Sequence, residues 1–72
     1  MSQAYRSNVL YAARLELAEA EEALDVARAY LAPIQHTFGP VTAAAFKAYG
    51  QAVNERARAR AQLVDAEQFA NE

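Results

Sequence analysis

Leucine recurs every seven residues in the first half of this chain, and alanine recurs every seven residues in the second half. The leucines are Leu10, Leu17, Leu24 and Leu31. The alanines are Ala45, Ala52, Ala59 and Ala66. Residues seven apart share one face of an α-helix, and four such repeats in succession are typical of long helices that pack along their length. The spacing therefore predicts two long helices, one in each half of the chain.

A further alanine follows three residues after each of the first three leucines, and these alanines pair by number with those of the second half. The positions 13 and 59, 20 and 52, and 27 and 45 each add to 72. A chain that reverses near residue 36 would bring alanine opposite alanine in successive layers, and small side chains would let the two backbones approach closely. We therefore expect an all-α fold, an antiparallel two-helix hairpin with a close-packed Leu/Ala seam.

Two prolines mark the expected break between the helices. Pro33 disfavours helical geometry in the residue before it, whereas Pro40 suits the first turn of a helix, where no N–H is needed. Ser2 or Ser7 could cap the start of the first helix. We expect one domain over residues 1–72, made of a helix over about 3–32, a turn over 33–39 and a helix over about 40–70.

Gly50 is the one residue inside the second expected helix that opposes helix formation, at a cost of about 1 kcal/mol relative to alanine. It marks either a close helix–helix contact opposite Glu22 or a kink. We favour the close contact, because functional hinges are uncommon in helices of this kind.

The chain has 72 residues, no cysteine and one histidine, which limits how it can be stabilised. A core in so short a chain rarely contributes more than about 3–5 kcal/mol. Disulfides are excluded and one histidine cannot build a zinc site, which leaves oligomerisation or docking onto a larger partner. The net charge of −2 offers no general attraction to nucleic acid or anionic lipid. Proline and glycine interrupt the longest uncharged run, so we expect no membrane span and a cytoplasmic protein.

Large apolar residues remain outside the Leu/Ala seam on both expected helices. They are Tyr11, Leu15, Val26, Phe46, Val53 and Val64. A lone hairpin has no third element to cover them, and monomers seldom expose an apolar patch of this size. We expect these residues to form a partner interface, either in a homodimer that makes a four-helix bundle or with a larger protein. Tyr11 and Leu15 are its expected hot spot.

The expected turn is apolar for a loop, since it contains Ile34 and Phe38. These side chains either plug the closed end of the hairpin next to Leu31 or form an anchor at the tip for a larger protein. We favour the plug, because it continues the heptad of the first helix.

Three arginines alternate with alanine at Arg56, Arg58 and Arg60, a pattern that raises the possibility of a phosphate-binding strip. Alternate residues point to different sides of a helix, so Arg58 should leave the face that the other two share. We expect these charges to flank the seam instead, with Glu16 beside Arg56. A dimeric hairpin that binds nucleic acid would resemble, in architecture alone, the plasmid-copy-number regulators of the Rop type. No motif here matches that family.

The pattern contains no catalytic constellation. Both serines lie near one terminus, the histidine has no acid near it in sequence, and no glutamate has the histidine three residues later that di-iron bundles require. We therefore expect no enzyme activity, metal, cofactor or small-molecule substrate. The expected function is that of a small helical adaptor or inhibitor that binds and modulates a larger protein, and the alternative is a structural component such as a small virion protein. Nineteen alanines, and six arginines against one lysine, are typical of GC-rich coding and favour a phage or bacterial source.

Overall fold

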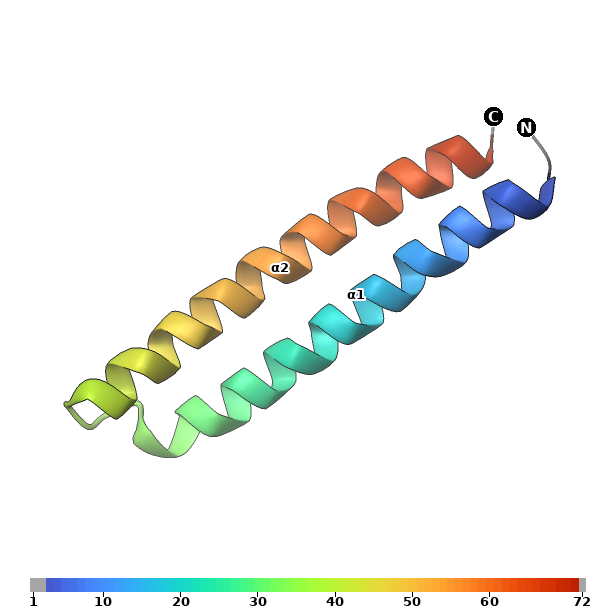
Figure 1. The fold of residues 1–72 in the computed structure, drawn as a ribbon. Helices are drawn as coiled ribbons and strands as arrows, with labels where there is room; N and C mark the ends of the chain where they lie inside the picture. Colours follow the sequence, from blue (N-terminus) through green and yellow to red (C-terminus); the bar gives the residue numbers. More distant parts are fainter. Residues whose placement is uncertain (1–2, 72) are drawn as a thin grey trace.

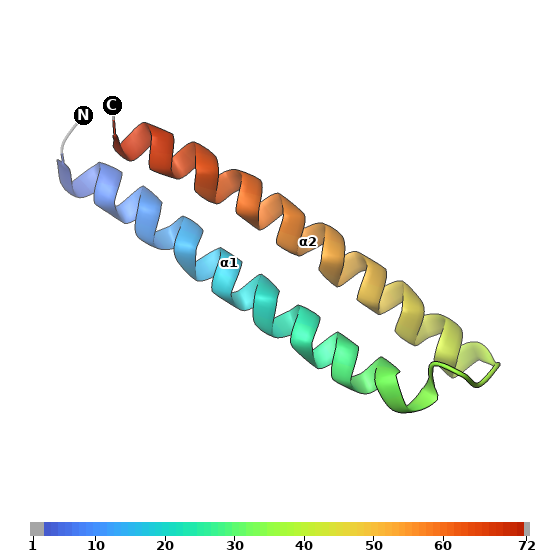
Figure 2. The same ribbon diagram turned by 180° about the vertical axis from the view of Figure 1, so that it is seen from behind.

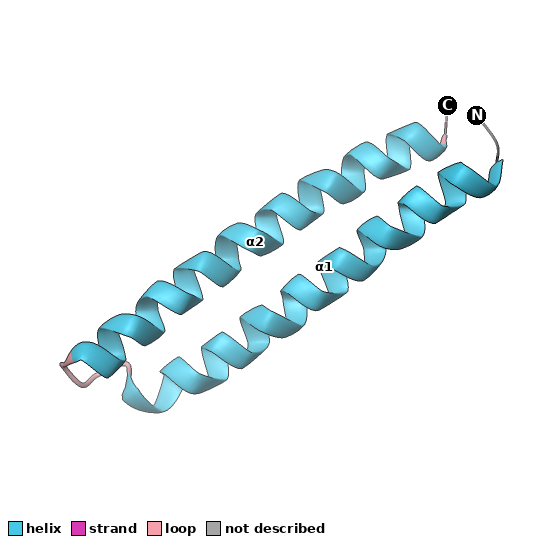
Figure 3. Ribbon diagram, in the orientation of Figure 1, coloured by secondary structure: helices cyan, strands magenta, loops and turns pink. Residues whose placement is uncertain are grey.

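The computed structural model describes residues 3–71 and forms an antiparallel pair of helices (Figure 1). Helix α1 spans Gln3–Leu31, a short 3-10 helix, η1, spans Ala32–Ile34, and helix α2 spans Pro40–Ala70. The start of α1 and the end of α2 lie together at the end opposite the turn (Figure 2). The Cα positions extend over 53 × 14 × 13 Å, the shape of a rod two helices wide. The predicted all-α hairpin is confirmed, and residues 3–71 contain no strand (Figure 3).

The ends of the helices follow from the two prolines. Pro33 has no N–H for a further α-helical hydrogen bond, so α1 ends at Leu31 and the chain continues for three residues as 3-10 helix. Pro40 is the first residue of α2, as its fixed φ favours. Ser7 lies within α1 and does not cap it, whereas Ser2 lies outside the described residues.

Two threonines and a glycine close the turn. The Thr37 N–H and hydroxyl both donate to the Ile34 carbonyl, at 3.0 and 2.8 Å. The buried Thr42 hydroxyl then donates to Thr37 Oγ1 at 2.8 Å, because the single hydroxyl proton of Thr37 is already used. Gly39 has φ 141° and ψ 175°, a conformation essentially restricted to glycine. Its carbonyl accepts a hydrogen bond from Ala43 N–H at 3.0 Å, which begins the α2 ladder.

The core of the hairpin consists of the two heptad series. Its buried apolar residues are Ala13, Leu24, Leu31, Ala45, Ala52, Ala59 and Ala66. Leu24 is the most deeply buried side chain, at 1% exposed. Leu10 and Leu17, toward the free end of the hairpin, are half-buried. The predicted Leu/Ala seam therefore forms along the length of the hairpin.

The two helices are offset along this seam from the predicted alignment. The residues that line the depressions between α1 and α2 show this offset. Across the depressions, residues of α1 face residues of α2 in pairs whose numbers add to 78: 9 and 69, 16 and 62, 23 and 55, and 30 and 48. The predicted alignment of alanine with alanine at a sum of 72 is wrong by at least one helical turn. The reason is that η1 carries the chain past α1 before it reverses, so the first turn of α2 extends beyond the end of α1 (Figures 1 and 2). Each seam alanine of α1 lines a depression with an alanine of α2 one heptad further along than predicted: Ala13 with Ala66, Ala20 with Ala59 and Ala27 with Ala52.

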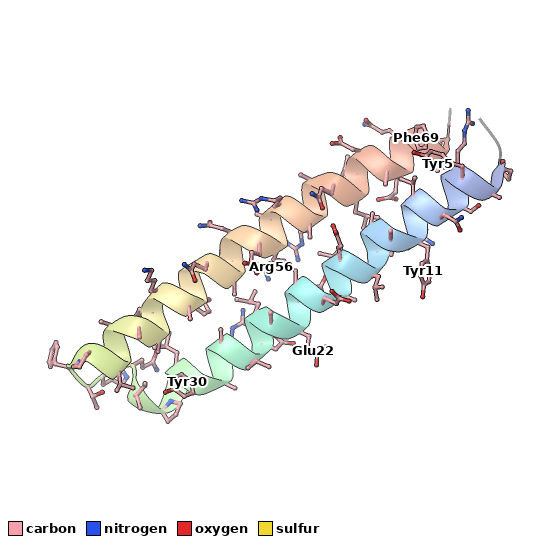
Figure 4. The ribbon with its side chains drawn as sticks, in the orientation of Figure 1. Tyr5, Tyr11, Glu22, Tyr30, Arg56 and Phe69 are labelled. Carbon is pink, nitrogen blue, oxygen red and sulfur yellow. The ribbon has the colours of Figure 1, made fainter. Side chains whose placement is uncertain are left out.

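Gly50 is not a point of close contact. Helix α2 runs through it without a break, and a Cβ built at Gly50 would meet nothing within 4 Å. Glu22, its predicted neighbour, is exposed, and Figure 4 shows it pointing away from α2. The predicted tight crossing at Gly50 is therefore wrong, and α2 shows no kink there (Figure 1).

Candidate interaction surfaces

Most of the large apolar side chains lie outside the core. Those that are exposed are Tyr5, Tyr11, Leu15, Val26, Tyr30, Phe38, Val41, Phe46 and Val64. The buried core contains Leu24 and Leu31, and its other apolar members are alanines. Large exposed apolar patches on proteins of this size usually mark interaction sites, so the surface is where candidate functional residues lie.

The hairpin also exposes more surface than a compact chain of its mass. Its accessible surface is 5330 Å², whereas a compact monomer of 7.9 kDa exposes about 4400 Å². Its radius of gyration is 16.3 Å, compared with about 11 Å for a compact domain of 72 residues. The excess of about 900 Å² is close to the area that each partner contributes to a standard protein interface.

A continuous groove follows the line between α1 and α2 on one side of the hairpin. It consists of four depressions, and neighbouring depressions share lining residues. Its α1 rim consists of Val9, Ala12, Glu16, Glu19, Ala23, Val26 and Tyr30. Its α2 rim consists of Val41, Ala44, Ala48, Gln51, Glu55, Arg58, Gln62, Asp65 and Phe69. We call this side the groove face.

Both rims of the groove face keep the seven-residue repeat without interruption. Successive rim residues are alternately three and four positions apart, from Val9 to Tyr30 on α1 and from Val41 to Phe69 on α2. The floor between the rims is made of seam alanines, including Ala20 on α1. The groove is therefore shallow and regular, with the same repeat as the seam beneath it.

The two ends of the groove are mainly apolar. Toward the turn, alanines are flanked by Val26, Tyr30 and Val41. Toward the free end, Val9 and Phe69 lie beside the alanines of the floor, with Asp65 as a charged neighbour. Both ends therefore offer apolar surface that the hairpin itself does not cover.

The middle of the groove is charged. Glu16, Glu19 and Glu55 lie there with Arg58, a balance of three carboxylates to one guanidinium. No ion pair joins these four groups to one another or to any other residue of the described range 3–71. The arginine that lines the groove together with Glu16 is thus Arg58. Arg56, which was predicted to lie beside Glu16, does not line this part of the groove.

Residues 3–71 contain one ion pair, which joins Arg28 and Asp25 across 3.9 Å on the exposed surface of α1. Within the same range, neither helix has the length and apolar character to cross a bilayer, and no three histidine, aspartate or glutamate residues gather where they could hold a metal ion. No protein-family model, curated protein or solved structure matches this chain.

The other side of the hairpin holds four of the six residues predicted as a partner interface. Phe46 lines a depression there with Arg28. Steps of alternately three and four residues lead from Arg28 back to Tyr11, and from Phe46 on to Val53 and Val64, so these residues share one side. Figure 4 shows the ring of Tyr11 pointing away from α2. We call this side the Tyr11 face.

The remaining two predicted interface residues lie elsewhere. Val26 lines the groove face with Tyr30. Leu15 is 47% exposed and lies at the outermost position of α1, between the two faces. The six residues therefore do not form one continuous patch, and the hairpin has two uncovered faces.

The turn presents one aromatic side chain to solvent. Phe38 is fully exposed, and Ile34 is half-buried. The predicted plug is therefore wrong for Phe38, because the hydrogen bonds of Thr37 close the turn and leave Phe38 outside it. The alternative, an anchor at the tip, is compatible with this exposure.

The three alternating arginines do not form a strip. Arg56 occupies a seam position and is half-buried, and Figure 4 shows it on the side of α2 that faces α1. Arg58 lies in the groove face. Arg60 follows the row of Phe46 and Val53 on the Tyr11 face. The cationic groups point to three different sides of the helix.

Reasoning from the sequence missed the groove face as a unit. The apolar pattern of the sequence did not single out Tyr30, Val41 or Phe69 as surface residues. The rims change from apolar at the ends to charged in the middle, so they form no continuous apolar stripe by which the sequence could reveal the groove.

Proposed function

We propose that this chain is a non-enzymatic protein–protein interaction module, which pairs with a second copy of itself and binds and modulates a larger protein. The observation that supports this proposal most strongly is the unequal distribution of apolar side chains. The core is built mostly of alanine, whereas nine large apolar side chains are exposed. Each large side chain that a partner buries fully would contribute about 1.5–3 kcal/mol, which is substantial for so small a hairpin.

The Tyr11 face is the surface we assign to self-association. Its apolar residues Tyr11, Phe46, Val53 and Val64 are surrounded by charges of both signs in equal number. These charged residues are Arg14, Arg28, Arg60, Glu21, Asp25 and Glu67. Two copies that meet through a face with balanced charge can pair opposite charges with one another, and the product would be a four-helix bundle.

The tip offers a further contact for a larger protein. Phe38 projects from a turn that is held by its own hydrogen bonds, so its ring is presented with little conformational freedom in the backbone. Exposed aromatic side chains on ordered backbone are typical hot spots of protein interfaces.

Self-association can be tested by the concentration dependence of the melting temperature. Because a dimer is stabilised by mass action, the midpoint should rise by several degrees over a hundredfold increase in concentration of the wild-type chain. Phe46→Asp should abolish this dependence. Phe38→Asp makes the same change at the tip and should preserve it. A wild-type midpoint that does not move with concentration would count against self-association.

The nucleic-acid alternative has less support, because the three arginines lie on different sides of α2. It requires salt-dependent retention on RNA or DNA that is lost when Arg56 and Arg60 are both replaced by alanine. Such retention would favour that alternative over the interaction module.

A further inference from the structure

We propose that the groove face binds an amphipathic α-helix of a different protein, and that this helix carries lysine or arginine at the middle of its apolar ridge. The inference rests on the proposed interaction function and adds the chemistry of the partner. Two properties of the groove support it, the spacing of its rims and its charge. The charge also opposes a second copy of this chain as the occupant.

The spacing of the rims favours a helix over an extended or globular partner. Rim residues on both α1 and α2 alternate at three and four positions over the whole groove, which is the spacing at which a packed helix presents its own side chains. The alanine floor keeps the groove open to the backbone of a third helix. A helix laid along the groove would complete a three-helix bundle.

The charge of the groove favours a basic helix. Glu16, Glu19 and Glu55 are exposed, with Arg58 as the one cation beside them and no ion pair among them. Cations at the middle of the partner helix would face this surplus of carboxylates, and complementary charges of this kind give orientation and specificity to an interface.

The same charge opposes a second copy of this chain on the groove face. Three of the four rim carboxylates lie near the middle of the groove, with Asp65 toward the free end, and a two-fold axis that overlays two full grooves maps middle onto middle. Such a dimer would bring six carboxylates and two guanidinium groups together. A like-charge contact of this kind is destabilising, so the occupant is a different chain.

The apolar ends set the position of the basic residues in the partner. Tyr30 and Glu16 are 14 positions apart on α1, which is two heptads or about 21 Å of helix. The partner helix should therefore place its basic residues two heptads from the apolar side chains that cover Tyr30 and Val26. Further apolar residues beyond the basic ones would cover Val9 and Phe69.

The probe is a displayed library of amphipathic helices of about 28 residues, with leucine fixed at the apolar heptad positions of the two outer heptads and every position of the two central heptads randomised. The full-length chain is the bait. Selected helices should be enriched about fivefold or more in lysine and arginine in their two central heptads. A chain with Glu16→Lys, Glu19→Lys and Glu55→Lys should select aspartate and glutamate there instead.

The matched control carries the same number of reversals on the Tyr11 face: Glu21→Lys, Asp25→Lys and Glu67→Lys. It should keep the preference for central basic residues, and circular dichroism should show each variant to be helical. Selection of no helices above background would overturn the inference. An equal loss of basic preference in the control would also overturn it, because the preference would then follow from the net charge of the chain and not from the groove. In either case the concentration dependence of melting still reports on self-association independently.

Discussion

The ring of Tyr5, in the first turns of α1, meets the ring of Phe69, at the end of α2, edge to face, with centroids 6.0 Å apart and planes at 86° (Figure 4). The guanidinium of Arg6 lies 5.8 Å from the centroid of the same Phe69 ring. Phe69 therefore helps to join the two helices at the free end of the hairpin, far from the turn. Its ring also forms the end of the groove face, so the same residue contributes to stability and to the proposed binding surface.

Phe69→Ala removes both ring contacts and should lower the free energy of unfolding by about 1–2 kcal/mol, because aromatic pairs and cation–π contacts each contribute on the order of 0.5–1.5 kcal/mol. Urea unfolding followed by circular dichroism measures the change. Phe38→Ala is the matched control, since Phe38 is fully exposed, and should change stability by less than about 0.5 kcal/mol. Equal effects of the two substitutions would contradict the role assigned to Phe69.

Gly50→Ala should stabilise the hairpin by about 0.5–1 kcal/mol, because alanine is the better helix former and the added Cβ meets nothing within 4 Å. Thermal melting at low protein concentration is the measurement. A loss of stability at all concentrations would show that the site is tighter than the hairpin indicates. A loss that appears only at high concentration would place Gly50 in the contact between two copies.

Gly39→Ala should have the opposite effect, although its Cβ would also meet no atom within 4 Å. The difference lies in the backbone, since φ at Gly39 is 141° and a side chain there is strained by about 1–3 kcal/mol. The same melting experiment compares the two alanine substitutions directly. If both glycine positions tolerated alanine equally, the assigned turn geometry would be wrong.

Ala52→Leu tests the close packing of the seam. Ala52 is 6% exposed, and a larger side chain there would force the helices apart, at a cost of about 1–3 kcal/mol. Ala61→Leu introduces the same side chain at an exposed position of α2 and should be nearly neutral. A seam that accepted leucine at position 52 as readily as at position 61 would not be an alanine seam.

Sequence patterns predicted the elements of this fold because their signals are local. The heptads of leucine and alanine select the buried side of each helix, and Pro33 and Pro40 mark where regular α-helix stops and starts. The alignment of the two helices was not predictable in the same way. A heptad presents the same face at several offsets, and the offset depends on how far the chain continues as η1 before it reverses.

The surfaces were predicted less well for a geometric reason. Projected on a straight helix, Tyr11 and Val26 are about 60° apart and seem to share a stripe, whereas in the seven-residue frame they are about 100° apart. The hairpin keeps the seven-residue frame along its whole groove, so Val26 belongs to the groove face and Tyr11 to the other side. The plug was favoured over the anchor for Phe38 because nothing in its sequence neighbourhood shows that hydrogen bonds of Thr37 and Thr42 close the turn without it.

The molar mass of the full chain in solution, measured by light scattering at micromolar concentration, tests the central claim that the hairpin covers an exposed apolar face with a partner. We predict a discrete dimer of about 16 kDa, twice the 7.9 kDa of one chain, with Phe46→Asp returning the mass to that of a monomer. A series of higher oligomers would favour an assembly component instead. A fully helical wild-type monomer of 7.9 kDa across the micromolar range would contradict the account.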